Sequence, residues 1–167
     1  MTERKRNVSE FHLREAQPGD EGLVLSFIRQ LAEYENLLDQ VEADEATLRH
    51  SLFERKAAHA LIAEENGEPI GFALYFYNFS TFIGRPGLYI EDVFIRPEYR
   101  GKGYGKAIFR HLANVALKEG CGRMEWICLD WNEPSLRFYR SMGAVPMDEW
   151  TVQRLSQVQL RKVAEGK

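Results

Sequence analysis

The chain has 167 residues, of which 44% are hydrophobic and 28% are charged, with a formal net charge of -3. These values suit one globular domain with its own core and exclude an intrinsically disordered chain. The small negative charge argues against nucleic acid or an anionic membrane as partner. No stretch approaches the ~20 apolar residues that span a bilayer.

The N-terminal residues and the cysteines suggest a cytoplasmic protein. Met1 to Arg6 are charged and lack the apolar core of a signal peptide. Cys121 and Cys128 have no metal-binding spacing, so we interpret them as reduced packing residues and expect no metal site. Polar residues 1–9 predict a flexible tail, which leaves residues 10–167 as a single domain.

The first half of the chain predicts a strand, two helices and a hairpin. Apolar and polar residues alternate over Phe11–Glu15, which predicts a strand. Apolar residues then recur at helical spacing from Leu23 to Tyr34, and Asp20 can cap the helix that this spacing predicts. A short helix is expected over Glu45–Phe53. The next elements are strands over Ala58–Glu65 and Ile70–Tyr77, joined by the turn-forming pair Asn66-Gly67, and then a loop over Phe79–Pro86.

The second half begins with a strand over Gly87–Ile95 that carries two carboxylates, Glu91 and Asp92, in an otherwise apolar run. The remaining predicted elements are a helix over Lys106–Glu119, a strand over Arg123–Asp130, a short helix from Asn132 to about Gly143, a strand over Trp150–Leu155 and a weakly helical tail over Ser156–Lys167. This order predicts an α/β fold in which a mixed sheet carries helices on both faces.

Three glycines, Gly101, Gly103 and Gly105, separate the apolar strand from the following helix. Glycines let the backbone approach a ligand, and the first amides of a helix favour an anion such as a phosphate. Arg100, Lys102 and Lys106 add positive charge. The spacing fits neither the Walker A motif nor the dinucleotide fingerprint. On its own, the pattern fits an ordinary glycine turn equally well.

The pattern Arg100-x-x-Gly103-x-Gly105 resembles the acetyl-CoA pyrophosphate loop of the GNAT superfamily of N-acetyltransferases. Further motifs, in the right order over about residues 10–155, resemble its diamine (spermidine/spermine) acetyltransferase branch. These motifs are Leu31-Ala32-Glu33-Tyr34-Glu35, Leu88-Tyr89-Ile90-Glu91-Asp92, Tyr99-Arg100-Gly101, Trp131-Asn132-Glu133-Pro134-Ser135 and Phe138-Tyr139.

The resemblance implies the GNAT fold, with about six to seven strands. Its two central parallel strands, Leu88–Ile95 and Arg123–Asp130, would splay apart around the pantetheine of acetyl-CoA. It also implies acetyl transfer to a primary amine of a small molecule, such as a polyamine or a thialysine-like amino acid, and we expect a homodimer. A peptide or protein N-acetyltransferase and a non-catalytic acetyl-CoA-binding regulator remain alternatives.

Acetyl transfer requires a group that takes a proton from the amine and a group that gives one to the departing thiolate. Glu91 is the candidate base, directly or through water, with a structural salt bridge as the alternative. Strand alternation places Asp92 on the opposite face, where a structural role is favoured. Tyr139 is the candidate acid on the basis of the resemblance, although its position also suits a packing tyrosine.

The resemblance also assigns binding residues. Those expected at acetyl-CoA are Val93, Phe94, Ile95, Arg100, Gly101, Lys102, Gly103, Tyr104, Gly105, Lys106, Asn132, Pro134, Ser135 and Tyr139. Those expected at the amine are Tyr34, Glu35, Glu91, Glu125, Trp126, Ile127 and Asp148, with the alignment at Asp148 open to a slip of one residue.

An acidic run lies near the first helix. Between Leu31 and Leu48 there are six acids and no lysine or arginine: Glu33, Glu35, Asp39, Glu42, Asp44 and Glu45. Such runs are usually solvated faces. In a polyamine-type enzyme the same run would attract a cationic substrate.

Overall fold

The computed structural model describes residues 10–166, so the expected tail over residues 1–9 lies outside the described part. The chain divides into two compact units, Met1–Ile127 and Cys128–Lys167, and each is described by itself. No helix among residues 10–166 combines the length and apolar character needed to cross a membrane.

The first unit is built on a five-stranded sheet in the order β1-β2-β3-β4-β5. Strands β1 to β4 are antiparallel neighbours, and β4 pairs with β5 in parallel, so the sheet is mixed as predicted. The strands are β1 (Phe11–Glu15), β2 (His59–Glu65), β3 (Glu68–Ser80), β4 (Arg85–Ile95) and β5 (Met124–Glu125).

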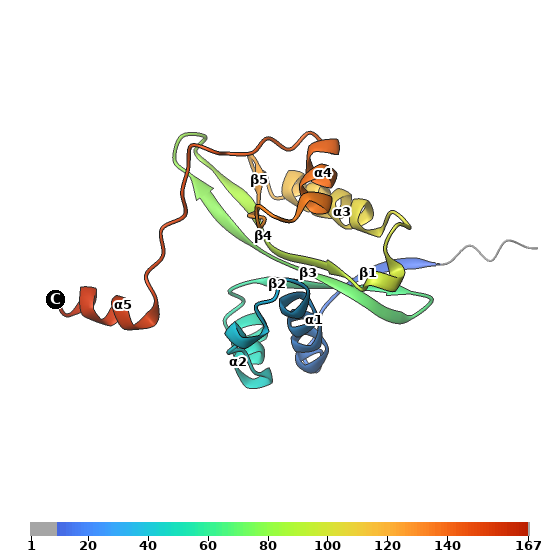
Figure 1. The fold of residues 1–167 in the computed structure, drawn as a ribbon, viewed down its shortest axis with the longest axis horizontal. Coiled ribbons are helices and arrows are strands. Elements are labelled where there is room, and N and C mark those ends of the chain that lie inside the picture. Colours follow the sequence, from blue (N-terminus) through green and yellow to red (C-terminus); the bar gives the residue numbers. More distant parts are fainter. Residues whose placement is uncertain (1–9, 167) are drawn as a thin grey trace, which may run out of the picture. The chain divides into compact units, whose positions relative to one another are not determined.

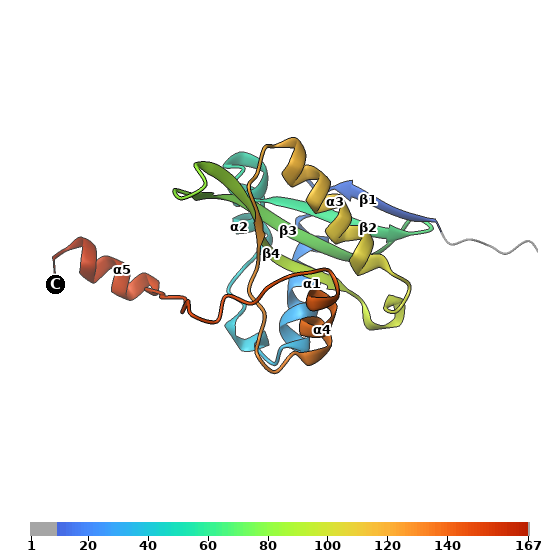
Figure 2. The same ribbon diagram turned by 90° about the horizontal axis from the view of Figure 1, so that it is seen from above.

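Helices cover both faces of this sheet (Figures 1 and 2). Helices α1 (Glu21–Tyr34) and α2 (Glu45–Arg49), the latter continued by a π-helical turn over His50–Glu54, lie on one face, and α3 (Tyr104–Lys118) lies on the other. Short 3-10 turns span Leu38–Gln40 and Pro97–Tyr99. Beneath α1 and α2, a buried core cluster includes Val24, Phe27, Ile62, Phe72 and Phe94.

A β-bulge interrupts the pairing of β3 with β4 at the two carboxylates. Leu74 lies opposite Asp92 while Tyr75 lies opposite Ile90, so Glu91 has no partner on β3. A bulge inserts one residue and reverses the alternation beyond it. Asp92 and Phe94 are two residues apart on β4, so Asp92 shares a face with this residue of the core cluster, whereas Glu91 is exposed.

Four sequence predictions need correction. The sheet has five strands rather than six or seven. The strand expected over Trp150–Leu155 is irregular, because the segment has no ladder partner in the described chain. Of Arg123–Asp130, only Met124–Glu125 pairs, opposite Leu88 and Tyr89. The loop expected over Phe79–Pro86 shrinks to a turn, because β3 and β4 continue their ladder to Ser80 and Arg85.

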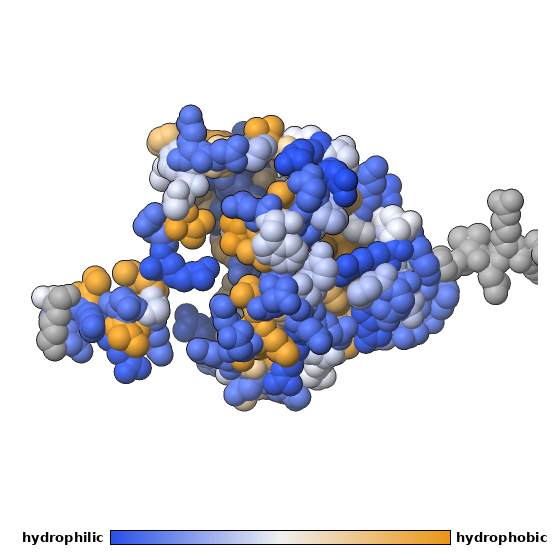
Figure 3. Space-filling model, in the orientation of Figure 1, coloured by the Kyte–Doolittle hydropathy of each residue, from blue (hydrophilic) through white to orange (hydrophobic). Residues whose placement is uncertain are grey.

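The second unit contains α4 (Glu133–Ser141) and α5 (Gln157–Ala164). The Asn132 side chain caps α4 by accepting a hydrogen bond from the Ser135 amide at 3.4 Å. Helix α5 carries apolar side chains that are more than half exposed, and Figure 3 shows hydrophobic surface on this helix. They are Val158, Leu160 and Val163.

Candidate active site

The segment that contains Gly101, Gly103 and Gly105, the glycine loop, has a backbone geometry suited to binding an anion. Gly101 and Gly103 have positive φ angles of 78° and 86°, and Gly103 is the N-cap of α3. A Cβ atom added at either position would meet no atom within 4 Å. The loop therefore leaves open space at the start of α3, where unpaired first-turn amides can bind an anion. These features fit a pyrophosphate group.

Two of the three cations near the loop already have protein contacts. Arg100 donates from Nε to the Ile95 carbonyl at 2.8 Å, and its guanidinium lies 4.8 Å from the centre of the Tyr34 ring. Lys102 pairs with Glu65, with 2.8 Å between Nζ and Oε1. Lys106 is exposed in the first turn of α3. Arg100 thus connects the glycine loop to the end of α1.

The loop geometry leads to a prediction for Gly103→Asp. The variant should bind acetyl-CoA at least ~10-fold more weakly, equivalent to ~1.4 kcal/mol, because it places a negative side chain in the open space and requires a non-glycine residue at φ 86°. Calorimetry with acetyl-CoA measures this. Gly84→Asp is the matched control, since Gly84 has a φ of 68° and open space but lies in the β3–β4 turn. Unchanged binding by folded Gly103→Asp would reject the phosphate-loop assignment.

Beyond the bulge, β4 has one edge outside the β5 ladder. Val93, Phe94 and Ile95 pair with β3 on one side. Among the described residues, β5 pairs with β4 only at Leu88 and Tyr89. Backbone groups of Val93–Ile95 that face away from β3 can therefore bind an extended ligand such as pantetheine.

Three carboxylates interact near the bulge. Burial, together with the charges of Glu91 and Glu35, raises the pKa of Asp92 to about 7. Burial also raises the pKa of Glu35, which caps the C-terminus of α1. Several acids of one charge in one place favour a cationic ligand. The structure thus brings two predicted substrate residues, Glu35 and Glu91, together with Asp92.

Of the three remaining candidates in the first unit, Glu125 and Trp126 have structural contacts and Ile127 is exposed. The Glu125 carboxylate pairs with Arg123 at 3.0 Å and accepts from the Asn78 amide at 3.0 Å. The Trp126 ring meets Phe109 of α3 edge-on, with 5.1 Å between ring centres. Ile127 is 58% exposed.

The other candidates lie in the second unit. Tyr139 is half-buried on α4, with its ring 5.6 Å from that of Phe138. Pro134 is in the first turn of α4, and Asn132 is buried as its cap. Asp148 is exposed in a turn that is closed by the Trp150 amide and the Met147 carbonyl.

Two residues of the candidate site, Asp92 and Glu65, were not identified as functional from the sequence. Asp92, for which a structural role was favoured, has the pKa shift described above. Glu65 was not considered, although it contacts both Lys102 and Tyr104 of the glycine loop. The only sequence signal for Glu65 is an acid at the end of an apolar strand.

Comparisons with known proteins identify the family. The profile of the Acetyltransferase (GNAT) family matches residues 26–144. Thialysine N-epsilon-acetyltransferase of Bos taurus is 40% identical over 91% of this chain and 96% of its own length. Spermidine/spermine N(1)-acetyltransferase-like protein 1 of Homo sapiens is 30% identical over 96% of this chain but only 25% of its own length.

Solved structures agree on the fold. An integron cassette protein from V. cholerae superposes with a TM-score of 0.76 at 27% identity, covering 93% of this chain and 98% of that one. An acetyltransferase from Clostridium acetobutylicum, solved with acetyl-CoA, gives a TM-score of 0.73 at 22% identity, covering 87% and 97%. The family profile and the Bos taurus relative show that the chain belongs to the GNAT family of acetyltransferases, and the glycine loop and the bulged strand β4 fit this assignment.

Proposed function

We propose that this acetyltransferase uses acetyl-CoA to acetylate a primary amine of a small molecule, either a polyamine or diamine or a thialysine-like amino acid. The carboxylate cluster of Glu35, Glu91 and Asp92 carries this proposal, because a cationic amine beside these three acids would favour their ionised forms. The names of the Bos taurus and Homo sapiens relatives support the same substrate class.

Several parts of the chain would hold acetyl-CoA, which supplies the acetyl group as a thioester. The amides that follow Gly101 and Gly103 suit the pyrophosphate, and the backbone of Val93–Ile95, which lies outside the β5 ladder, suits the pantetheine. Lys106 adds an exposed positive charge. Asn132, Pro134 and Ser135 complete the proposed contacts at the start of α4.

Glu91 and Tyr139 are the proposed catalytic residues. An ammonium has no lone pair, so Glu91 accepts its proton, directly or through water. The exposure of Glu91 at the bulge leaves its carboxylate accessible to an incoming amine. Tyr139 donates its phenolic proton to the departing thiolate. Tyr34, Glu35, Glu125, Trp126, Ile127 and Asp148 are the proposed substrate contacts.

The test of the proposed function is acetyl-CoA consumption against a panel of polyamines, thialysine-like amino acids and basic peptides. We expect turnover of one or more small amines, with peptides at least ~10-fold poorer in kcat/KM. Preference for peptides would favour a peptide N-acetyltransferase. Binding of acetyl-CoA without turnover of any amine would favour a non-catalytic regulator.

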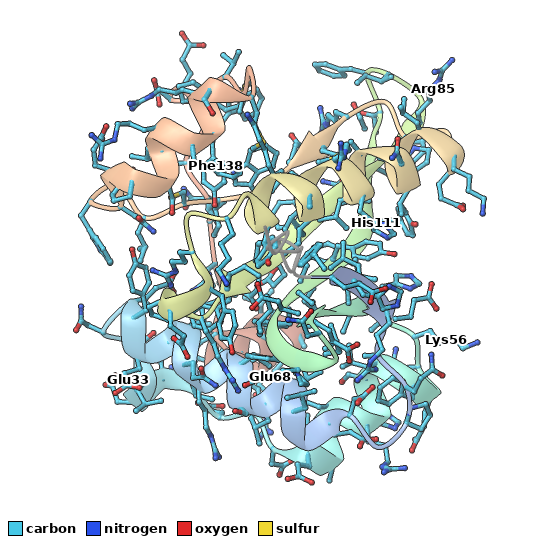
Figure 4. The ribbon with its side chains drawn as sticks, turned by 90° about the vertical axis from the view of Figure 1, so that its right-hand side faces the viewer. Glu33, Lys56, Glu68, Arg85, His111 and Phe138 are labelled. Carbon is cyan, nitrogen blue, oxygen red and sulfur yellow. The ribbon has the colours of Figure 1, made fainter. Side chains whose placement is uncertain are left out.

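The acidic run leads to a prediction on charge steering. Glu33, Asp39 and Glu42 are exposed, and Figure 4 shows Glu33 on the outer surface of α1. Their attraction acts over a Debye length of ~10 Å at 0.1 M salt. Added salt should therefore lower kcat/KM for spermidine more than for a monoamine of similar length.

Replacing Glu33, Asp39 and Glu42 with glutamine should reduce this difference. Asp44 stays unchanged, because it caps α2 by accepting a hydrogen bond from the Thr47 amide at 2.7 Å. Glu35 also stays unchanged, because it belongs to the carboxylate cluster. Equal salt dependence for the two amines would identify the run as a solvated face.

We further propose a cytoplasmic homodimer in which residues 10–167 act as one domain. The family profile crosses the boundary between the two units at Ile127, which supports a single functional domain. Exposed apolar side chains in the second unit, including Trp150 and Val152 at 75% and 66%, support an association of two copies. Light scattering of the purified protein measures its mass in solution.

A further inference from the structure

Glu65, the last residue of β2, is an acid that the proposed mechanism does not use. It is 9% exposed, and its Oε1 accepts hydrogen bonds from the Lys102 ammonium at 2.8 Å and from the Tyr104 hydroxyl. Burying a carboxylate is unfavourable unless it is paired. Both donors lie 37 or more residues away in the sequence, in the glycine loop and at the start of α3.

The Tyr104 ring has a second attachment to the sheet. Phe11 of β1 stacks on it with 4.4 Å between ring centres, and Phe11 lies directly opposite Glu65 in the β1–β2 ladder. Phe11 thus holds the Tyr104 ring, and Glu65 holds its hydroxyl. The first residue of α3 is therefore fixed to this edge of the sheet.

Lys102 and Tyr104 flank Gly103, the glycine with positive φ that caps α3. Without a side chain, Gly103 cannot fix its own conformation through contacts. Holding the residues on both sides restricts the direction of the amides that follow. An anion site whose donors are already oriented binds without the free-energy penalty of ordering them.

Glu65 also determines what Lys102 does. The Lys102 ammonium is paired with the Glu65 carboxylate at 2.8 Å, and this hydrogen bond is the main cause of the raised pKa of Lys102. Lys102 therefore acts in the loop as an anchor to Glu65, and anion binding falls mainly to the backbone amides.

We propose that Glu65 is a positioning residue for the acetyl-CoA pyrophosphate, acting through Lys102 and Tyr104 without touching the ligand. The inference rests on the proposed use of acetyl-CoA. It assigns a positioning role in acetyl-CoA binding to Glu65, which lies at the end of β2, outside the glycine loop and outside β4.

The test compares CoA, which carries the pyrophosphate, with pantetheine, which does not. Calorimetry of Glu65→Gln should show CoA binding weakened about 10-fold, the size of one charged hydrogen bond. In turnover, KM should rise for acetyl-CoA but not for acetyl-pantetheine, with kcat unchanged for both. Glu64→Gln is the matched control, because Glu64 precedes Glu65 on β2 and pairs instead with Arg14 of β1 at 2.7 Å.

A double-mutant cycle tests the route of action. In a Lys102→Met/Tyr104→Phe background, Glu65→Gln should change CoA affinity less than twofold. An undiminished effect there would overturn the proposal, as would equal losses for CoA and pantetheine, because both indicate a general structural defect. If Glu65→Gln does not fold, single Lys102→Met and Tyr104→Phe variants replace it, and full CoA affinity in both would overturn the proposal.

The wild-type protein separates the two levels of inference. Failure of the wild type to bind CoA would reject the proposed function. CoA binding by the wild type together with equal binding by folded Glu65→Gln would reject only the role of Glu65.

Discussion

Tyr139→Phe should lower kcat by roughly 10²-fold, within the range for loss of a general acid, and should leave acetyl-CoA affinity nearly unchanged. The substitution removes only the hydroxyl, so the half-buried ring and its contact with Phe138 should persist. Single-turnover kinetics is the appropriate measurement, because slow product release would hide a chemical effect in the steady state.

Tyr77→Phe is the control for this prediction. Tyr77 is a partly exposed tyrosine of β3 for which no catalytic role is proposed, so its loss of a hydroxyl should leave kcat within twofold. If Tyr139→Phe also stays within twofold in single-turnover experiments, Tyr139 is a packing residue. The proton for the thiolate would then come from another group or from water.

Local sequence patterns predicted most of the fold, because most of its elements follow local rules. The 3.6-residue spacing placed α1, and Asn66-Gly67 placed the β2–β3 turn, where Asn66 has a φ of 54°. The positions at which pairing ends were less predictable. Residues near Trp150 have strand-forming composition, but a strand also needs a partner edge, which a single sequence does not specify.

The candidate site likewise has parts that local sequence predicts and parts that depend on residues far apart in the chain. The glycine loop was predictable because its chemistry lies in consecutive residues. The carboxylate cluster and Glu65 depend on residues far apart in the sequence. The bulge at Glu91 interrupts the alternation from which the faces of Glu91 and Asp92 were predicted, and nothing in the β4 sequence specifies where a bulge occurs.

Asp92 should make the stability of the protein depend on pH. An unfolded aspartate has its ordinary pKa of 3.8, whereas burial and neighbouring charges raise the pKa of folded Asp92 to about 7. The folded state therefore keeps this proton to higher pH than the unfolded state. As the pH rises from about 4 to about 7, the protein loses stability through this group.

Asp92→Asn removes the ionisable group and keeps its shape. The variant should match the wild type near pH 4 and exceed its free energy of unfolding at pH 8. The difference between the ordinary pKa of 3.8 and the raised pKa of about 7 corresponds to an upper value of about 4 kcal/mol. Urea unfolding at pH 4, 6 and 8 measures the difference in free energy of unfolding between Asp92→Asn and the wild type. Asp130→Asn is the control, because Asp130 is exposed. A difference that does not change with pH would show that Asp92 ionises as it does in the unfolded chain.

The same linkage connects this instability to the substrate. A cationic amine at Glu35, Glu91 and Asp92 would favour the ionised form of Asp92 and offset the penalty of burying it. A saturating diamine should therefore raise the melting temperature of the wild type more at pH 8 than at pH 5. In Asp92→Asn this pH dependence should be smaller, since the group that responds to the amine is gone. An unfavourable carboxylate at the bulge would then be explained by the charge of its ligand.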